Sequence, residues 1–319
     1  MQKVTTIFKA KCKIGIVAVG FCFCIVVTYA IVSIRFSSNF VPYNVNVLVK
    51  YFQTSGDKAF HAPGGWIFYS HDIGIIVNQW RHTRHNEQVI CSLNDTLSKL
   101  GVQLIVVPVP DKETIIQTYS LFNVEVASNQ RKQFLTRLEK RKVAVIDLTP
   151  AFFANRLRDQ LYVKRDTHWD QEGIRLGAKE VASRISMAVS GRPQEEYLLK
   201  DTLISGPCDL SMMLHDSTSY SRKCTIILCR DGSVLNDAPS SDIMIFGDSF
   251  ANVNWKQGAG IGAYITYFTK MPTFTYTTLR GNNQGPRLLL KYLQTHKKPP
   301  RVVVWIFASR FLFDGIEPY

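Results

Sequence analysis

The sequence predicts an α/β fold in which a parallel β-sheet carries helices on both faces. Three short apolar runs have the length and β-branched content of buried strands: VQLIVVPV at 102–109, DIMIFG at 242–247 and VVVWIFA at 302–308. Segments with helical periodicity separate these runs along the chain. Because parallel strands need crossover connections that are usually helical, this alternation favours a parallel sheet with right-handed crossovers.

The remaining elements follow the same alternation. Two further strands are predicted, VAVIDL at 143–148 and TFTY at 273–276. The predicted helices are 128–140, a short helix beginning at Thr149 as N-cap, 171–186 after a capping Asp170, 260–270 and 287–295. Residues 190–240 contain short strands and turns whose order the sequence does not define.

The N-terminal region predicts a membrane anchor. Residues 14–34 are uncharged and apolar, and as a helix they would rise roughly 32 Å, close to the hydrocarbon thickness of a bilayer. Four lysines precede this stretch and Arg35 follows it, so the positive-inside rule places residues 1–13 in the cytoplasm and the part after Arg35 across the membrane. A cleaved signal peptide is the alternative, with Thr28 and Ala30 as a weak small-x-small cleavage site.

The expected domain organisation follows from this anchor. Residues 35–63 form a linker and lead-in, and residues 64–319 form one domain, with no internal repeat in the sequence. The chain has 38 Lys and Arg against 25 Asp and Glu, and four of these cations precede the anchor. Outside the cytoplasm this excess argues against a nucleic-acid partner and favours anionic lipid or an acidic polysaccharide, although charge dispersed for solubility also explains it.

Cysteine spacing gives no sign of a metal centre. Cys91, Cys208, Cys224 and Cys229 follow the anchor and show no CxxC pair, so a zinc site is not expected. The GAGIGA stretch at 258–263 follows no predicted strand directly, so no dinucleotide cofactor is expected either. In an oxidising compartment these four cysteines can form two disulfides, with three possible pairings.

Two segments carry the residue types of a nucleophilic active site. Ser249 follows the 242–247 run at the expected start of a helix, where N–H groups and the helix dipole favour a developing anion. The earlier segment DTHW contains Asp166 and His168, two residues apart. A hydroxyl, an imidazole that accepts its proton and a carboxylate that orients the imidazole are the parts of a Ser-His-Asp triad. Taken singly, each segment also fits a plain turn.

GDSF at 247–250 after a buried strand, with DTHW at 166–169 earlier in the chain, is a specific combination. The chain resembles the SGNH-hydrolase-like acetyltransferases of alginate O-acetylation, the AlgJ and AlgX type. Segments similar to the family cover most of the predicted domain: GGWIFYSHD (64–72), VVPVPDKETI (106–115), DLSMML (209–214) and VVVWIFASRFL (302–312). Asp166 and His168 precede the serine, as in circularly permuted relatives and unlike ordinary SGNH esterases.

The resemblance also implies an oxyanion hole. The Ser249 N–H is the expected donor, and no Asn follows the 302–308 strand where an ordinary SGNH enzyme has one. Further oxyanion or substrate-binding candidates are Gly281, Asn252, Asn282, Arg310, Trp255 and Lys112.

By this resemblance the protein is a single-pass inner-membrane O-acetyltransferase with its domain in the periplasm, closer to the anchored AlgJ type because the chain ends soon after the last predicted strand. Ser249 would take an acetyl group supplied by a membrane-bound O-acyltransferase partner and pass it to an exopolysaccharide. Two alternatives remain, an acetyl esterase with the same triad and a non-catalytic scaffold of a polysaccharide export complex.

Overall fold

The structure is a computed structural model that describes eight segments of the chain. These segments are residues 59–72, 82–116, 124–157, 160–185, 196–217, 219–278, 284–296 and 298–319. The expected anchor at 14–34 and its cleavage site lie outside them. Within the described segments, no helix combines the length and the apolar character needed to cross a bilayer.

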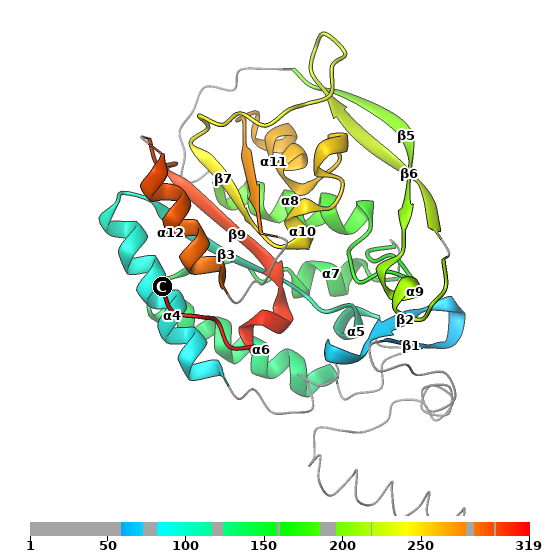
Figure 1. Ribbon diagram of the computed structural model, residues 1–319, viewed down its shortest axis with the longest axis horizontal. Coiled ribbons are helices and arrows are strands. Elements are labelled where there is room, and N and C mark those ends of the chain that lie inside the picture. The colour runs from blue at the N-terminus through cyan, green and yellow to red at the C-terminus, as the bar shows by residue number, and fades with distance from the viewer. Residues whose placement is uncertain are drawn as a thin grey trace, which may run out of the picture.

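A five-stranded parallel sheet forms the centre of the fold (Figure 1). In sheet order its strands are β4 (Ala144–Val145), β3 (Gln103–Val109), β9 (Val302–Ala308), β7 (Ile243–Gly247) and β8 (Phe274–Thr277). β9 is central, because it pairs with β3 on one side and with β7 on the other. The carboxyl ends of these three strands therefore meet at one edge of the sheet, the usual place for an active site in such folds.

Strand residues alternate between two apolar clusters, one on each face of the sheet. In β9, Val304 and Ile306 belong to one cluster, whereas Val303 and Trp305 belong to the other. Both faces are buried along the whole of β3, β7 and β9 apart from Gln103. This two-sided burial explains why these strands are continuous apolar runs in the sequence.

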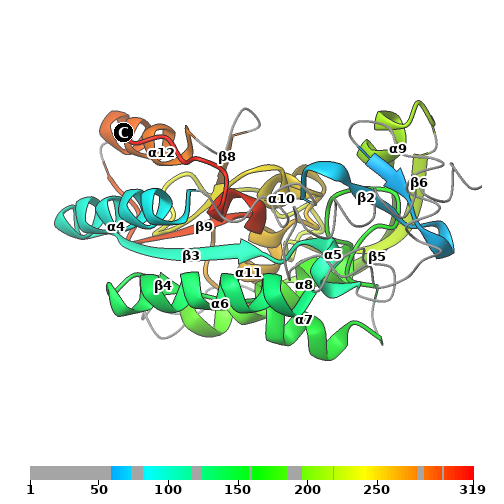
Figure 2. The ribbon, with the colours of Figure 1, turned by 90° about the horizontal axis from the view of Figure 1, so that it is seen from below.

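Helices cover the two faces of the sheet, as the sequence predicts (Figure 2). One face carries α4 (Thr83–Lys99) and α12 (Gly285–Thr295), and the other carries α8 (Gln171–Ile185) and α11 (Ile261–Thr269). α6 (Val124–Lys140) packs on α4 and β4, and α7 (Thr149–Asn155) packs beside α8. Short elements near the carboxyl edge are α5 (Lys112–Ile115), α9 (Asp209–Met213), α10 (Ser249–Asn252), η4 (Trp255–Gln257) and η6 (Ser309–Leu312).

Two antiparallel hairpins lie outside the main sheet. The first joins β1 (Ala59–His61) to β2 (Ile67–Tyr69) through the 3-10 turn η2 (Pro63–Gly65). The second joins β5 (Leu198–Pro207) to β6 (Ser219–Leu228) in a ten-residue register and extends along one side of the molecule (Figure 1). This long hairpin lies within residues 190–240, where the sequence predicts short strands and turns but does not define their order.

The structure shortens one predicted strand and moves one predicted cap. The sequence predicts a strand over 143–148, but β4 contains only Ala144 and Val145 at the edge of the sheet. Thr149, predicted as an N-cap, is the first residue of α7, and the Asp147 carboxylate accepts its backbone N–H at 3.0 Å. Asp170 directly precedes α8, but its carboxylate accepts the N–H of the adjacent Gln171 at 2.7 Å, not one from the second or third helical residue as a side-chain N-cap does.

The turn between β7 and α10 is fixed by close packing against β9. Asp248 accepts the Phe250 N–H at 2.8 Å through Oδ1 and the Ala308 N–H at 2.9 Å through Oδ2. A Cβ on Gly247 would lie 1.9 Å from the Ile306 carbonyl oxygen, so only glycine fits between the two strands. Ser249 is thereby held at the first position of α10.

Replacing Gly247 with alanine should destabilise the fold. The added methyl group meets backbone of the central strand, so Gly247→Ala should lower the free energy of unfolding by about 2 kcal/mol or more in chemical denaturation. Gly315→Ala is the matched control, because its Cβ would meet nothing nearer than a His82 ring atom at 3.7 Å. Equal stability of the two variants would contradict the close approach of β7 and β9.

Candidate active site

The DTHW segment forms a tight loop between α7 and α8. Tyr162 and Trp169 form an isolated antiparallel bridge at its base, and the Val163 N–H donates to the His168 carbonyl at 3.1 Å. Trp169 is fully buried, and its Nε1 donates to the Phe250 carbonyl at 3.2 Å. The loop is thus closed on itself and attached to α10, which begins with Ser249.

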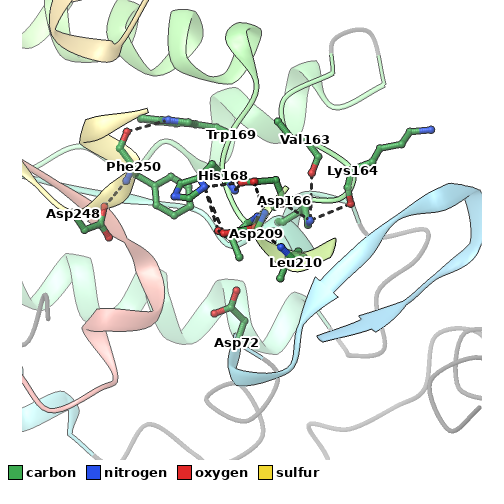
Figure 3. Close-up of polar contacts among 12 residues, drawn as sticks. Asp72, Val163, Lys164, Asp166, His168, Trp169, Asp209, Leu210, Asp248 and Phe250 are labelled. Atoms are coloured by element: carbon green, nitrogen blue, oxygen red, sulfur yellow. Dashed lines mark hydrogen bonds and ion pairs between the residues drawn. The ribbon is translucent and has the colours of Figure 1, made fainter. Parts of the chain in front are cut away.

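Asp166 and His168 form a close carboxylate–imidazole pair (Figure 3). Asp166 Oδ1 lies 2.6 Å from His168 Nδ1 and accepts the His168 backbone N–H at 3.0 Å. An ionised carboxylate only accepts hydrogen bonds, so Nδ1 carries the proton and Nε2 is the basic nitrogen. This is the tautomer that a general base requires.

The pair shifts the pKa of both groups. Burial alone raises the pKa of Asp166, but the His168 hydrogen bond and charge outweigh it and hold that pKa well below its ordinary value. Burial alone lowers the pKa of His168, but the Asp166 hydrogen bond and charge, with the charges of Asp209 and Asp248, raise it above the ordinary 6.5. The imidazolium form of His168 is therefore stabilised.

Asp209 also belongs to this site, although the sequence does not assign it a role there. Its backbone N–H donates to Asp166 Oδ2 at 2.9 Å, and its carboxylate accepts the Thr167 N–H at 2.7 Å. Asp209 Oδ2 also lies 3.7 Å from His168 Nδ1. The sequence gives no local signal for this role, because Asp209 reaches the loop from α9, more than forty residues later.

The structure brings the serine turn beside the histidine. The rings of His168 and Phe250 lie 5.0 Å apart between centroids, and Phe250 directly follows Ser249 (Figure 3). His168 Nε2 is buried and accepts no hydrogen bond from any described residue, Ser249 included. The carboxylate–imidazole contact of the predicted triad is thus present, and the serine–imidazole contact is not formed.

A cavity of about 520 Å³ opens beside this pair. His168 and Asp166 line one part of it, and Asn252, one of the predicted substrate-binding residues, also lines it. The other walls come from the β5–β6 hairpin, α9 and the segment after α10. A volume of this size is within the usual range for a small-molecule site.

The other predicted binding residues lie elsewhere. Arg310 pairs with the buried Asp72 at 3.0 Å, and Lys112 is buried and donates to backbone carbonyls. Trp255 donates through Nε1 to Asp237 at 2.6 Å and does not line the cavity. Gly281 and Asn282 lie outside the described residues.

The described cysteines are free, and one acidic cluster has metal-compatible spacing. Cys91, Cys208, Cys224 and Cys229 are free thiols, so the disulfides allowed by the sequence are not formed. In the described part of the chain, the one group with metal-compatible spacing is Asp166, His168 and Asp209, whose ligand atoms lie within 4.8 Å of one another. Hydrogen bonding accounts for this spacing, because His168 Nδ1 carries the proton shared with Asp166.

A parallel sheet covered on both faces, with a serine turn after β7 and an Asp-His loop at its carboxyl edge, defines an SGNH hydrolase-like domain. Residues 61–309 match the family described as SGNH hydrolase-like domain, acetyltransferase AlgX. The chain belongs to this family, and its domain is of the alginate O-acetyltransferase type.

The curated relatives are distant in sequence. A protein of Pseudomonas syringae pv. tomato named "Probable alginate O-acetylase AlgJ" is 22% identical over 270 residues, which cover 77% of this chain and 67% of that protein. The alginate biosynthesis protein AlgX of the same organism is 23% identical over 277 residues, which cover 79% of this chain and 55% of that protein. The chain therefore spans about two thirds of the AlgJ relative and just over half of the AlgX relative.

Two solved structures share the fold. The O-acetyltransferase domain of Pseudomonas putida AlgJ matches with a TM-score of 0.64 at 20% identity, over 82% of this chain and 94% of that chain. AlgX of Pseudomonas aeruginosa matches with a TM-score of 0.62 at 19% identity, over 78% of this chain and 61% of that chain. These matches support the parallel-sheet fold that the sequence predicts.

Replacing Asp166 with asparagine should lower the pKa of His168. The variant keeps an oxygen near Nδ1 but loses the charge that raises the pKa, while burial still lowers it. Because the folded pKa of His168 lies above 6.5, the stability from this pair is complete below pH 6.5 and is lost as the pH rises through the folded value. The stability difference between wild type and Asp166→Asn should therefore shrink over that range.

NMR titration of the imidazole measures this effect directly. Asp216→Asn is a suitable control, because it removes a carboxylate of the same region whose charge is paired with Arg165. An unchanged His168 pKa in Asp166→Asn would show that the carboxylate does not determine the protonation of the ring.

Proposed function

We propose that this protein is a membrane-anchored O-acetyltransferase that carries an acetyl group on Ser249 and delivers it to a polysaccharide hydroxyl. The observation that carries the proposal is the half-buried His168, with Nδ1 bonded to Asp166 and a buried Nε2 that has no hydrogen-bond partner among the described residues, beside the serine turn. A base so oriented is what a neutral hydroxyl needs to become a nucleophile. Membership of the acetyltransferase family supports the choice of acyl group.

In the first step, Ser249 Oγ would attack the carbonyl carbon of an acetyl donor. The serine proton passes to His168 Nε2, and Asp166 stabilises the imidazolium that forms. The bond from the acetyl carbon to the leaving group then breaks, and His168 returns the proton to that group. Acetyl-Ser249 and the free leaving group are the products of this step.

In the second step, a sugar hydroxyl would attack acetyl-Ser249. His168 accepts the hydroxyl proton and returns it to Ser249 Oγ as the ester bond to serine breaks. The Ser249 N–H, in the first turn of α10, is the proposed donor to the oxyanion in both steps, because first-turn N–H groups have no intrahelical acceptor. Asn252 lies one turn later and lines the cavity, so its side chain is the second candidate donor.

The cavity beside His168 is the proposed acceptor site. Its walls combine apolar side chains such as Ile204 and Val253 with polar side chains such as Tyr220 and Gln257, a mixture suited to a sugar ring. Two cations line it. Arg222 is paired with Asp170 at 2.6 Å, whereas the Lys256 side chain is exposed, so Lys256 is the better placed to meet an anionic sugar.

The cellular setting is part of the same proposal. Residues 14–34 supply the anchor, which places the domain on the periplasmic side of the inner membrane. A membrane-bound O-acyltransferase is the proposed source of the acetyl group. The names of the AlgJ and AlgX relatives support alginate, a uronate polymer, as the acceptor class, and the excess of cations is consistent with it.

Acetyl labelling tests the nucleophile. Incubation with an activated acetyl ester should add one acetyl mass to the peptide that contains Ser249, and Ser249→Ala should abolish this addition. Ser211→Ala is the matched control, because Ser211 lies on α9 near the loop, fully buried and outside the proposed machinery. Labelling that persists in Ser249→Ala would place the nucleophile on another residue.

The fate of the label separates transfer from hydrolysis. Isolated acetyl-enzyme should lose its label to an added uronate oligosaccharide faster than to buffer alone, and the acetylated sugar should appear in equal amount. If the label is released only as acetate, the protein is an esterase with the same acyl-serine chemistry.

Lys256 tests the acceptor site. Lys256→Ala should raise KM for an anionic oligosaccharide about two- to fivefold, the effect of an exposed ion pair worth about 0.5–1 kcal/mol, and leave KM for a neutral one unchanged. Lys223→Ala removes an exposed lysine of β6 that does not line the cavity and should change neither value. An equal effect of Lys256→Ala on both acceptors would exclude charge recognition at this position.

A further inference from the structure

A lysine that the proposed chemistry does not use lies buried beneath the DTHW loop. Lys112 is the first residue of α5, directly after β3, and only 4% of it is exposed. Its Nζ donates to the Asp166 carbonyl at 2.7 Å and to the Val163 and Lys164 carbonyls at 3.4 Å. All three acceptors are backbone atoms of the segment that leads into the catalytic pair.

The surroundings of Lys112 stabilise a positive charge. Its Nζ lies 5.8 Å from the Trp66 ring centroid and 5.4 Å from that of Phe68, within the range of cation–π attraction. Burial lowers the pKa of Lys112 to about 8, while the charges of Glu113, Asp209, Asp166 and Asp72 oppose this decrease. At neutral pH the ammonium group is therefore still mostly protonated and able to donate all three hydrogen bonds.

These hydrogen bonds connect the DTHW loop to the end of a strand of the main sheet. The DTHW loop is not part of the main sheet, and the backbone that leads into it is otherwise held by the Ile67 N–H on the Lys164 carbonyl at 2.8 Å and the Ser211 N–H on the Arg165 carbonyl at 3.3 Å. Lys112 comes from the carboxyl end of β3, next to β9, which in turn pairs with the strand that carries Ser249. It is a direct link between the frame that holds the nucleophile and the loop that holds the base.

We infer that Lys112 is a positioning residue. It fixes the position of the Asp166–His168 pair relative to the carboxyl edge of the sheet, and so determines the distance and direction from His168 Nε2 to Ser249. Small displacements between a base and a nucleophile lower the rate without weakening substrate binding. The role that the sequence suggested for Lys112, contact with substrate, requires exposure that this side chain lacks.

Substitution of Lys112 separates positioning from substrate binding. Lys112→Met keeps the length and loses the donors, so kcat should fall about 10- to 100-fold while KM changes less than about threefold. Lys112→Arg keeps a charged donor and should recover at least about tenfold of the lost rate. Lys298→Met is the control, because Lys298 is exposed, pairs with Asp242 and lies at the opposite edge of the sheet.

A second readout does not depend on the proposed transfer activity. The proton shared by His168 Nδ1 and Asp166 should give a strongly deshielded NMR resonance, which should shift or broaden in Lys112→Met, return in Lys112→Arg and stay unchanged in Lys298→Met. If wild type shows the resonance but transfers no acetyl group, the proposed function fails while this test of Lys112 still stands.

Two results would overturn the inference. One is a Lys112→Met enzyme with wild-type kcat and an unshifted resonance. The other is a fall in thermal stability and kcat that leaves the resonance in place and that Lys112→Arg does not recover, which is the pattern of a purely structural residue. If Lys112→Met does not fold, Lys112→Gln, which keeps an N–H donor without charge, is measured against the same outcomes.

Discussion

The Asp166 carboxylate is the constraint on which the candidate site depends. Oδ1 accepts two N–H groups of His168, from the backbone at 3.0 Å and from the ring at 2.6 Å, and Oδ2 accepts the Asp209 N–H at 2.9 Å. One side chain thus closes the loop, orients the imidazole and holds the start of α9. Hydrogen bonds to a charged group contribute about 1.5–3 kcal/mol each, so the loss of this carboxylate would affect fold and chemistry together.

A second carboxylate holds the turn that carries Ser249. Asp248 accepts the N–H groups of Phe250 and Ala308, which fixes the turn to the neighbouring strand β9. The proposed nucleophile Ser249 and the proposed base His168 are therefore each positioned by a buried acid, one in the turn after β7 and one in the DTHW loop. The contacts between the two halves include the Trp169 hydrogen bond to Phe250, the packing of His168 on the Phe250 ring and the hydrogen bonds that Lys112 donates to the loop from the end of β3.

The sequence predicts those parts whose signals are local. The strands of the parallel sheet are continuous apolar runs because both of their faces are buried, and Asp166 and His168 are two residues apart in one tight turn. The β5–β6 hairpin has no such signal, since Leu199 and Leu203 of β5 are at least half exposed and the alternation expected of a half-buried strand is weak. Asp209 escapes notice because its contact depends on how α9 folds back. The sequence shows that Lys112 carries a charge, but it does not show that this side chain is buried beneath the DTHW loop.

The β5–β6 hairpin helps to form the cavity but contributes neither residue of the Asp166–His168 pair. Its strands pair with each other and not with the main sheet, and its attachments to the body include Arg222 to Asp170 at 2.6 Å and the Tyr264 hydroxyl to the Thr225 carbonyl at 2.6 Å. Residues from this hairpin form one wall of the cavity, whereas Asp166 and His168 come from elsewhere in the chain. Insertions or exchanges in the hairpin can therefore reshape the cavity during evolution while the reacting groups keep their geometry, so two homologues can diverge in the molecules they accept before they diverge in chemistry.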